Sequence, residues 1–174
     1  MHRLLFALAL CLMSAACSEE DPAALFADVS YQVRCLDCEP RTADGPERDL
    51  SVVNGETGTS LSCEAAGGLV SLELETSDYA FKIISARLGA DPGGQCEVRV
   101  KEGINEYRGA CKAEGSNDEQ PCEVELTADG SGFIGRVYCN KIRHHLTASL
   151  FRYVVAPNTT DEPAEITASG CTGL

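Results

Sequence analysis

The stretch VSYQVRC, residues 29–35, decides the fold class of this chain. Apolar and polar residues alternate along it without a break. Successive side chains of a β-strand point to opposite faces of a sheet, so strict alternation predicts a strand with one face in the core and one face in water. The stretch therefore predicts a half-buried strand and not a helix.

Strand signals recur along the rest of the chain. They are separated by stretches rich in Gly, Pro, Asn and Asp, which are typical of turns and loops. Asn54-Gly55 is a tight-turn signal, and it predicts residues 61–63 as the return strand of residues 50–53. The other candidate strands are residues 69–74, 79–86, 96–100, 122–126, 133–139, 148–155 and 164–167.

These signals predict the fold class and the domain organisation. No long stretch beyond the N-terminal segment carries apolar residues at helical spacing. About eight to ten short strands predict an all-β domain, either an antiparallel β-sandwich or a partly open barrel. We see no internal repeat, so we expect residues 29–174 to form a single domain.

The N-terminal segment has the layout of an export signal. Arg3 provides a basic start, residues 4–13 form an unbroken apolar run, and residues 14–16 (SAA) are small. This order is typical of a signal peptide. The apolar run is shorter than the ~20 residues that span a bilayer as a helix, so we expect residues 1–16 to be a cleaved signal peptide.

Residues 14–17 (SAAC, from Ser14 to Cys17) resemble the lipobox of bacterial lipoproteins, in which a cysteine is acylated after cleavage in front of it. The resemblance implies that Cys17 carries lipid and attaches the protein to a cell-envelope membrane, with residues 17–28 as a tether. Several acyl chains anchor stably, at about 0.8 kcal/mol for each buried CH₂. Ser18 after the cysteine implies the outer membrane. The same small residues also suit an ordinary signal peptidase, which would release a secreted protein.

The number of cysteines bears on the role of Cys17. Nine cysteines lie from position 17 onward, and an odd number cannot all pair within the chain. If Cys17 is lipidated, eight remain, and an exported chain is expected to join them in disulfides. These eight are Cys35, Cys38, Cys63, Cys96, Cys111, Cys122, Cys139 and Cys171.

Two disulfides follow from hairpin symmetry. Cys122 and Cys139 are equidistant from a turn at residues 130–131, so they face each other if the chain folds back there. Cys96 and Cys111 show the same symmetry about another glycine-containing turn. Each disulfide would close a loop of about fifteen residues and stabilise the fold by ~3 kcal/mol.

The other four cysteines leave the pairing open. A disulfide between Cys63 and Cys171 would tie down the last strand and contribute ~4–5 kcal/mol, and Cys35 would then join Cys38. The alternative joins Cys35 to Cys63 and Cys38 to Cys171.

The charge of the chain excludes some partners. The net charge is −13, and it becomes about −14 when Arg3 is removed with the signal peptide. An acidic protein without a basic stripe repels phosphate backbones and anionic headgroups, so we expect no nucleic acid partner and no electrostatic hold on lipid. Calcium is compatible with this charge, but residues 114–119 lack the ligand spacing of a calcium loop. A protein of the envelope is the expected partner.

No motif predicts catalysis, a metal site or a cofactor. His144 and His145 are adjacent, and neighbouring residues of a strand point to opposite faces, so one metal ion cannot easily bind both. We therefore expect a non-catalytic binding module. Two alternatives remain. One is a secreted, disulfide-rich inhibitor that presents residues 89–95 to a protease. The other is a thiol-redox enzyme using Cys35 and Cys38, although no helical pattern follows this C-x-x-C to lower a thiol pKa.

Residues 63–171 are similar in layout to the small mycobacterial surface lipoprotein antigens, which combine a lipobox and a tether with a compact β domain. Cys63 and Cys171 take the places of that family's early and late cysteines, and residues 69–74 and 133–137 fall where it has strands. The resemblance implies a surface antigen or interaction protein.

Overall fold

The computed structural model describes residues 24–35, 44–89, 96–111, 121–147 and 151–174, and within these ranges it contains β-strands and no helix. The strands are β1 (Phe26–Arg34), β2 (Glu47–Val53), β3 (Thr59–Ala66), β4 (Leu69–Thr76), β5 (Tyr79–Arg87), β6 (Glu97–Glu102), β7 (Asn105–Ala110), β8 (Cys122–Asp129), β9 (Gly132–His144), β10 (Phe151–Val155) and β11 (Ala164–Ser169). All pairings between these strands are antiparallel.

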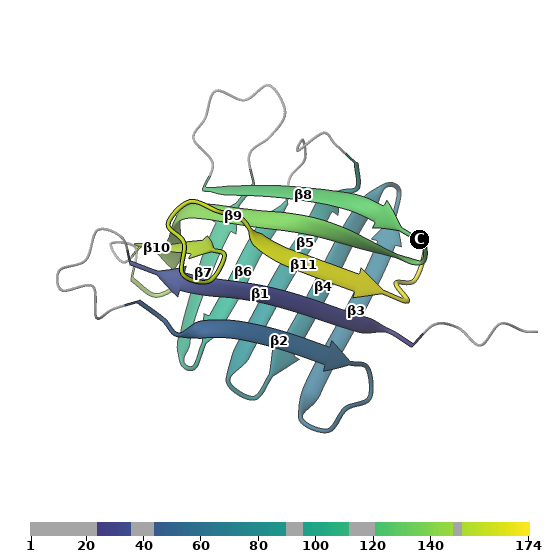
Figure 1. The fold of residues 1–174 in the computed structure, drawn as a ribbon, viewed down its shortest axis with the longest axis horizontal. Coiled ribbons are helices and arrows are strands. Elements are labelled where there is room, and N and C mark those ends of the chain that lie inside the picture. The colour runs from purple at the N-terminus through teal and green to yellow at the C-terminus, as the bar shows by residue number, and fades with distance from the viewer. Residues whose placement is uncertain (1–23, 36–43, 90–95, 112–120, 148–150) are drawn as a thin grey trace, which may run out of the picture.

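The strands form two layers around one core. The front layer has the order β8-β9-β11-β1-β2, and the back layer has the order β7-β6-β5-β4-β3. The short strand β10 pairs with both β1 and β9. The strands of one layer cross those of the other at a steep angle, with β8 and β2 at the two edges of the front layer (Figure 1). The predicted all-β sandwich is therefore confirmed, with its layers in the crossed arrangement.

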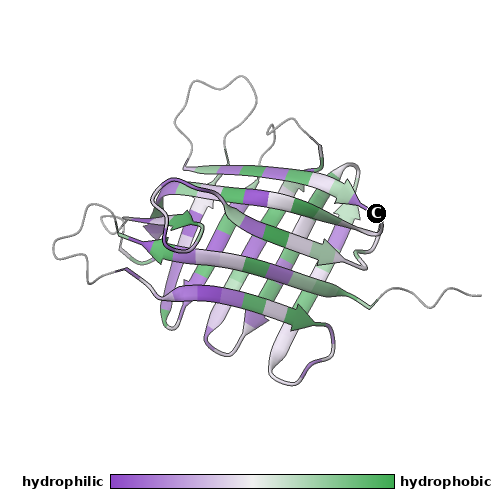
Figure 2. Ribbon diagram, viewed as in Figure 1, coloured by the Kyte–Doolittle hydropathy of each residue, from purple (hydrophilic) through white to green (hydrophobic). Residues whose placement is uncertain are grey.

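The strand at residues 29–35 shows how the sequence builds these layers. In β1 buried and half-buried residues alternate from end to end, and Val29, Tyr31 and Val33 point into the core. The strand begins at Phe26, three residues before the expected domain boundary at Val29. Figure 2 shows the same alternation of apolar and polar bands along most strands of both layers.

Strand β9 belongs to both layers. Its first half pairs with β8 and β11 in the front layer, and its end pairs with β7 in the back layer. Phe133 and Val137 point inward in the first half, whereas Ile142 and His144 are the buried residues of the second. The inward positions change from odd to even numbers at Lys141, whose φ is +58°. A bulge of this kind bends a strand and lets it turn the corner between two sheets.

A partly buried polar cluster joins β2 to the back layer. Arg48 of β2 reaches Glu102 of β6 with Nη2 at 2.7 Å, and their side chains are only 17% and 12% exposed. The Tyr31 hydroxyl donates to Glu102 Oε1 at 3.1 Å, and the Arg48 guanidinium lies 3.8 Å from the ring centre of Tyr79. Burial, together with the Glu102 carboxylate, raises the pKa of Tyr31. The cluster therefore links the two layers where no strand pairing does.

Two expectations from the sequence are corrected by the structure. Residues 61–63 are not the return strand of residues 50–53, because β2 pairs with β1 and β3 pairs with β4 in the other layer. The chain crosses between layers at residues 54–58, so the turn at Asn54-Gly55 closes no hairpin. Strand β7, residues 105–110, was not among the expected strands. Its short sequence NEYRGA has one large apolar residue, Tyr107, to mark an inner face.

We expect the contact between β9 and β11 to tolerate no side chain at Gly132. A Cβ there would overlap the backbone carbonyl oxygen of Ala168, and backbone cannot move aside as a flexible side chain can. Gly132→Ala should lower the free energy of unfolding by about 2–3 kcal/mol, measured by urea denaturation.

Gly103→Ala is the matched control. Gly103 has a φ of +59° in open space, so this substitution adds backbone strain but no overlap, at a cost of about 1 kcal/mol. Equal losses in the two variants would contradict the close approach at Gly132.

Candidate functional site

The expected lipidation site, Cys17, lies outside the described residues. The strand that follows the expected tether begins at Phe26, which is opposite Val53 of β2 on one side and Ser169 of β11 on the other. In the part of the chain that the structure describes, no helix is long and apolar enough to cross a membrane.

Three disulfides are present among the described residues. Cys122 and Cys139 are directly opposite in the β8–β9 ladder, with Cα atoms 4.0 Å apart. Cys96 and Cys111 flank the β6–β7 hairpin, with Cα atoms 5.0 Å apart. The third disulfide joins Cys63 to Cys171, with a Cα separation of 4.7 Å. All three are pairs expected from the sequence, and they indicate an extracytoplasmic protein, because the cytosol keeps most thiols reduced.

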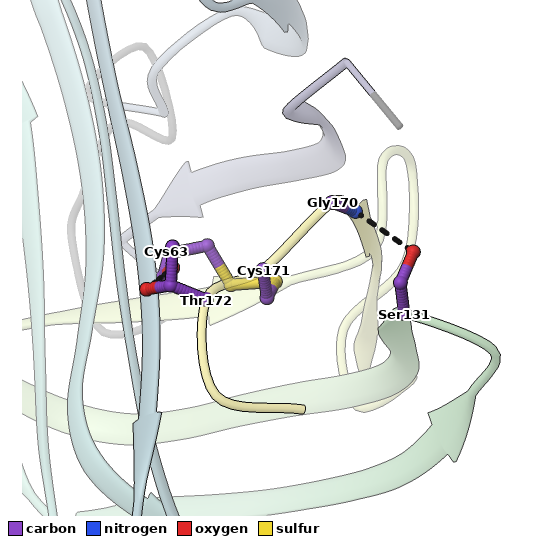
Figure 3. Close-up of a disulfide and its surroundings, with 5 residues drawn as sticks. All are labelled: Cys63, Ser131, Gly170, Cys171 and Thr172. Atoms are coloured by element: carbon purple, nitrogen blue, oxygen red, sulfur yellow. Dashed lines mark hydrogen bonds between the residues drawn. A yellow bond between two sulfur atoms is a disulfide. The ribbon is translucent and has the colours of Figure 1, made fainter. Parts of the chain in front are cut away.

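The Cys63–Cys171 disulfide fastens the C-terminal residues onto the edge of β3 (Figure 3). Thr172 donates its backbone N–H to the Cys63 carbonyl at 3.0 Å and accepts from the Ala65 N–H at 2.7 Å. Cys171 also donates its N–H to the Ser131 carbonyl at 2.9 Å, next to the β8–β9 turn. The C-terminus therefore closes the seam between the front layer and β3.

Cys35 is disulfide-bonded, and Cys38, the partner that we expect for it, lies outside the described residues. The Cys35 backbone N–H donates to Asp44 Oδ1 at 2.8 Å, and the same carboxylate pairs with Arg34 at 3.1 Å. Cys35 thus follows a strand, whereas redox cysteines of C-x-x-C motifs are activated at a helix N-terminus. The local geometry gives no support to thiol chemistry here.

His144 is buried at the end of β9 and has partners within the protein. Its Nδ1 accepts the backbone N–H groups of Leu146 at 3.3 Å and Thr147 at 3.1 Å, and its ring lies edge-on to Tyr107. Across the described ranges, no group of three or more His, Cys, Asp or Glu side chains could hold a metal ion. Most of residues 89–95 and all of residues 114–119 lie outside those ranges, so the inhibitor loop and the acidic loop have no structural description.

A groove of about 400 Å³ lies on the outer face of the front layer, over β8, β9 and β11. Two rows of side chains form it, and each row crosses the three strands in register. Ile134 is 47% exposed at the centre of the first row, and Arg136 occupies the centre of the second. The rows are Thr127–Ile134–Thr167 and Glu125–Arg136–Glu165.

The groove lies on a face with a large excess of negative charge. Alternation along β1, β2, β8, β11 and residues 132–140 of β9 identifies the outward positions, and these positions hold seven carboxylates and two bases, Arg34 and Arg136. Arg34 is already paired with Asp44. The seven acids are Asp28, Glu47, Asp49, Glu123, Glu125, Asp129 and Glu165.

The outer face of the back layer is different because its charges are balanced. Lys82 lies 3.3 Å from both Glu73 and Glu75, and Arg99 lies 2.9 Å from Glu97. Across the described residues, six bases stand among five acids on this face. The bases are Lys82, Arg87, Arg99, Lys101, Arg108 and Arg143, and the acids are Glu64, Glu73, Glu75, Glu97 and Glu106. Charge is thus nearly balanced on the back face, whereas acidic side chains outnumber basic ones on the front face.

The pKa of Asp28 reflects both burial and the negative charge of a neighbouring carboxylate on the front face. Partial burial and the nearby Asp49 carboxylate raise the pKa of Asp28. Asp28 of β1 lies opposite Thr167 and so continues the row of Ile134 onto β1. Asp49 of β2 lies opposite Ser30 of β1. The negative charge of Asp49 therefore adds to the effect of burial in opposing the ionisation of Asp28.

Sequence reasoning did not find the groove. The hairpin turn at residues 130–131 was expected, and its register alone places Glu125 opposite Arg136. Residues 164–167 were also expected to form a strand, but the position of that strand beside β9 is a contact between distant parts of the chain that leaves no local pattern.

Comparison with known proteins gives no relative for this chain. No protein-family model, no curated protein and no solved structure matches it. The functional argument therefore rests on the residues and their geometry.

We expect the Cys63–Cys171 disulfide to stabilise the protein more than a hairpin disulfide does. It joins residues 108 apart, whereas Cys96–Cys111 joins residues 15 apart. By loop entropy, replacing both members of the first pair with Ala should cost about 4–5 kcal/mol, against about 3 kcal/mol for the second. Guanidinium denaturation of the two double variants measures the difference, and the reverse order would contradict the argument.

Asp28→Asn should raise the melting temperature at pH 7. The folded state raises the pKa of this carboxyl, so its ionised form is less stable in the folded protein than in the unfolded chain. The gain should be present at pH 7 and should disappear below about pH 3.9, where the carboxyl is protonated even in the unfolded chain. Thermal melts of both proteins at pH 7 and pH 3 check this, and Glu73→Gln on the balanced back face should give no such gain.

Proposed function

We propose that this protein is a lipid-anchored, non-catalytic interaction module of the cell envelope, attached through Cys17 and displaying its front face to a protein partner. The N-terminal sequence supports the anchor, since residues 1–16 have the layout of a signal peptide and residues 14–17 resemble a lipobox. The disulfides support the compartment.

The observation that carries the binding role is the groove on the front face. Glu125 and Glu165 line it and make no ion pair within the described residues, although Arg136 stands between them in the same row. Ile134 is a large apolar side chain left half in water beside them. Charged and apolar groups without internal partners, gathered in a concave surface, are the features of a contact site for another molecule.

The disulfides make this face a rigid platform. Cys122–Cys139 lies in the β8–β9 ladder that carries one side of the groove, and Cys63–Cys171 fixes the residues that follow β11. A surface held on strands and covalently fixed at both sides loses little conformational freedom when a partner binds.

The anchor is tested by the intact mass and the location of the mature protein, produced in a bacterial host that acylates lipoproteins. We expect a mass of residues 17–174 plus acyl chains, recovered with the membranes. Reduction should add eight hydrogens, two for each of three observed disulfides and two for the disulfide of Cys35.

Cys17→Ser is the matched variant, and it should lack the acyl mass and leave the membrane fraction. A wild-type mass without lipid, in protein recovered outside the membranes, would contradict the anchor and favour a secreted protein.

A further inference from the structure

The two outer faces of the sandwich differ in a way that points to a kind of partner. On the back face, the bases and acids neutralise one another through ion pairs such as Lys82–Glu73 and Arg108–Glu106. On the front face, Asp28, Asp49 and Glu165 have no base within ion-pair distance among the described residues. A face with an excess of carboxylates is complementary in charge to a basic partner.

We propose that the groove over β8, β9 and β11 docks a basic, extended segment of a partner protein, with an apolar side chain over Ile134 and Lys or Arg side chains on the flanking carboxylates. This inference rests on the proposed interaction role and names the chemistry of the partner. Its site is the two rows Thr127–Ile134–Thr167 and Glu125–Arg136–Glu165, continued by Asp28 and Asp49.

Charge complementarity selects this partner class. A nucleic acid or an anionic lipid surface would be repelled by seven carboxylates. A small inorganic cation would satisfy the carboxylates but would leave Ile134 in water. A polypeptide supplies both kinds of group at once, since side chains at alternate positions of an extended segment lie about 7 Å apart on one face.

The spacing of the site fits such a segment. Neighbouring strands are about 4.8 Å apart, so Glu125 and Glu165, two strands apart, are separated by about 10 Å across the row. Arg136 stands between them and prevents two adjacent bases from binding there, which favours a segment whose bases flank an uncharged centre. Thr127 and Thr167 flank Ile134 in register and complete an uncharged row.

The test uses the mature protein in detergent and a nine-residue peptide, KTKTLTKTK, with ETETLTETE as the charge-reversed probe. Binding is measured by calorimetry, and the site is located from NMR shift changes. We expect the lysine peptide to bind weakly, to lose affinity about tenfold as salt rises from 20 to 200 mM, and to shift resonances of β8, β9 and β11. The glutamate peptide should not bind.

Matched variants distinguish binding at the groove from nonspecific attraction to the net negative charge of the protein. Glu125→Gln with Glu165→Gln on the front face should weaken binding about threefold to tenfold, whereas Glu73→Gln with Glu75→Gln on the back face removes the same charge and should leave affinity unchanged. Ile134→Ser should weaken binding, and Leu69→Ser, at an exposed apolar residue of the back layer, should not.

Three outcomes would overturn the proposal. They are no binding of the lysine peptide at 20 mM salt, equal weakening by the two charge variants, and shift changes on β4 to β6 in place of β8, β9 and β11. None of them depends on the acyl mass, so failure of the docking site and failure of the lipid anchor are distinguishable.

Discussion

The whole arrangement depends on one strand that serves two sheets. Strand β9 has a single extra residue at Lys141, which adopts a positive φ, and its inner face changes there from Phe133 and Val137 to Ile142 and His144. Side chains of a strand alternate with a period of two, so a shift by one residue exchanges the buried and exposed faces. Without that shift, the second half of β9 would turn Arg143 into the core and Ile142 into water.

Three further contacts join the two layers at the edges that β9 does not connect. The Arg48–Glu102 pair holds the β2 edge, the Gly89 N–H donates to the Leu126 carbonyl at the β8 edge, and the C-terminal disulfide holds the β3 edge. Each joint links segments distant in sequence, and each lies where strand pairing stops. The sandwich is therefore closed by a different interaction at each edge, although the two sheets share one continuous hydrogen-bonded path.

Local patterns were sufficient to predict some of these features and not others. Alternation predicted the strand at residues 29–35, and the symmetry of Cys122 and Cys139 about a turn predicted a hairpin whose register the structure shows. The predicted partner of β2, residues 61–63, was wrong because a turn signal such as Asn54-Gly55 indicates only that the chain changes direction. The groove was missed for a related reason, because it requires β11 beside β9, and no pattern near residues 164–169 reports which strand they will meet.

The Cys63–Cys171 disulfide can form only late in synthesis, because its two cysteines are 108 residues apart. Cys63 is synthesised long before Cys171, and four of the other described cysteines lie between them in the chain. During that interval β3 presents an uncovered edge, with the backbone groups of Cys63 and Ala65 that Thr172 will occupy. Such an edge is a template for pairing with other chains. Cys171 and Thr172 thus cover an edge that forms much earlier in the chain, and a newly made molecule remains exposed to mispairing and aggregation until these two residues arrive.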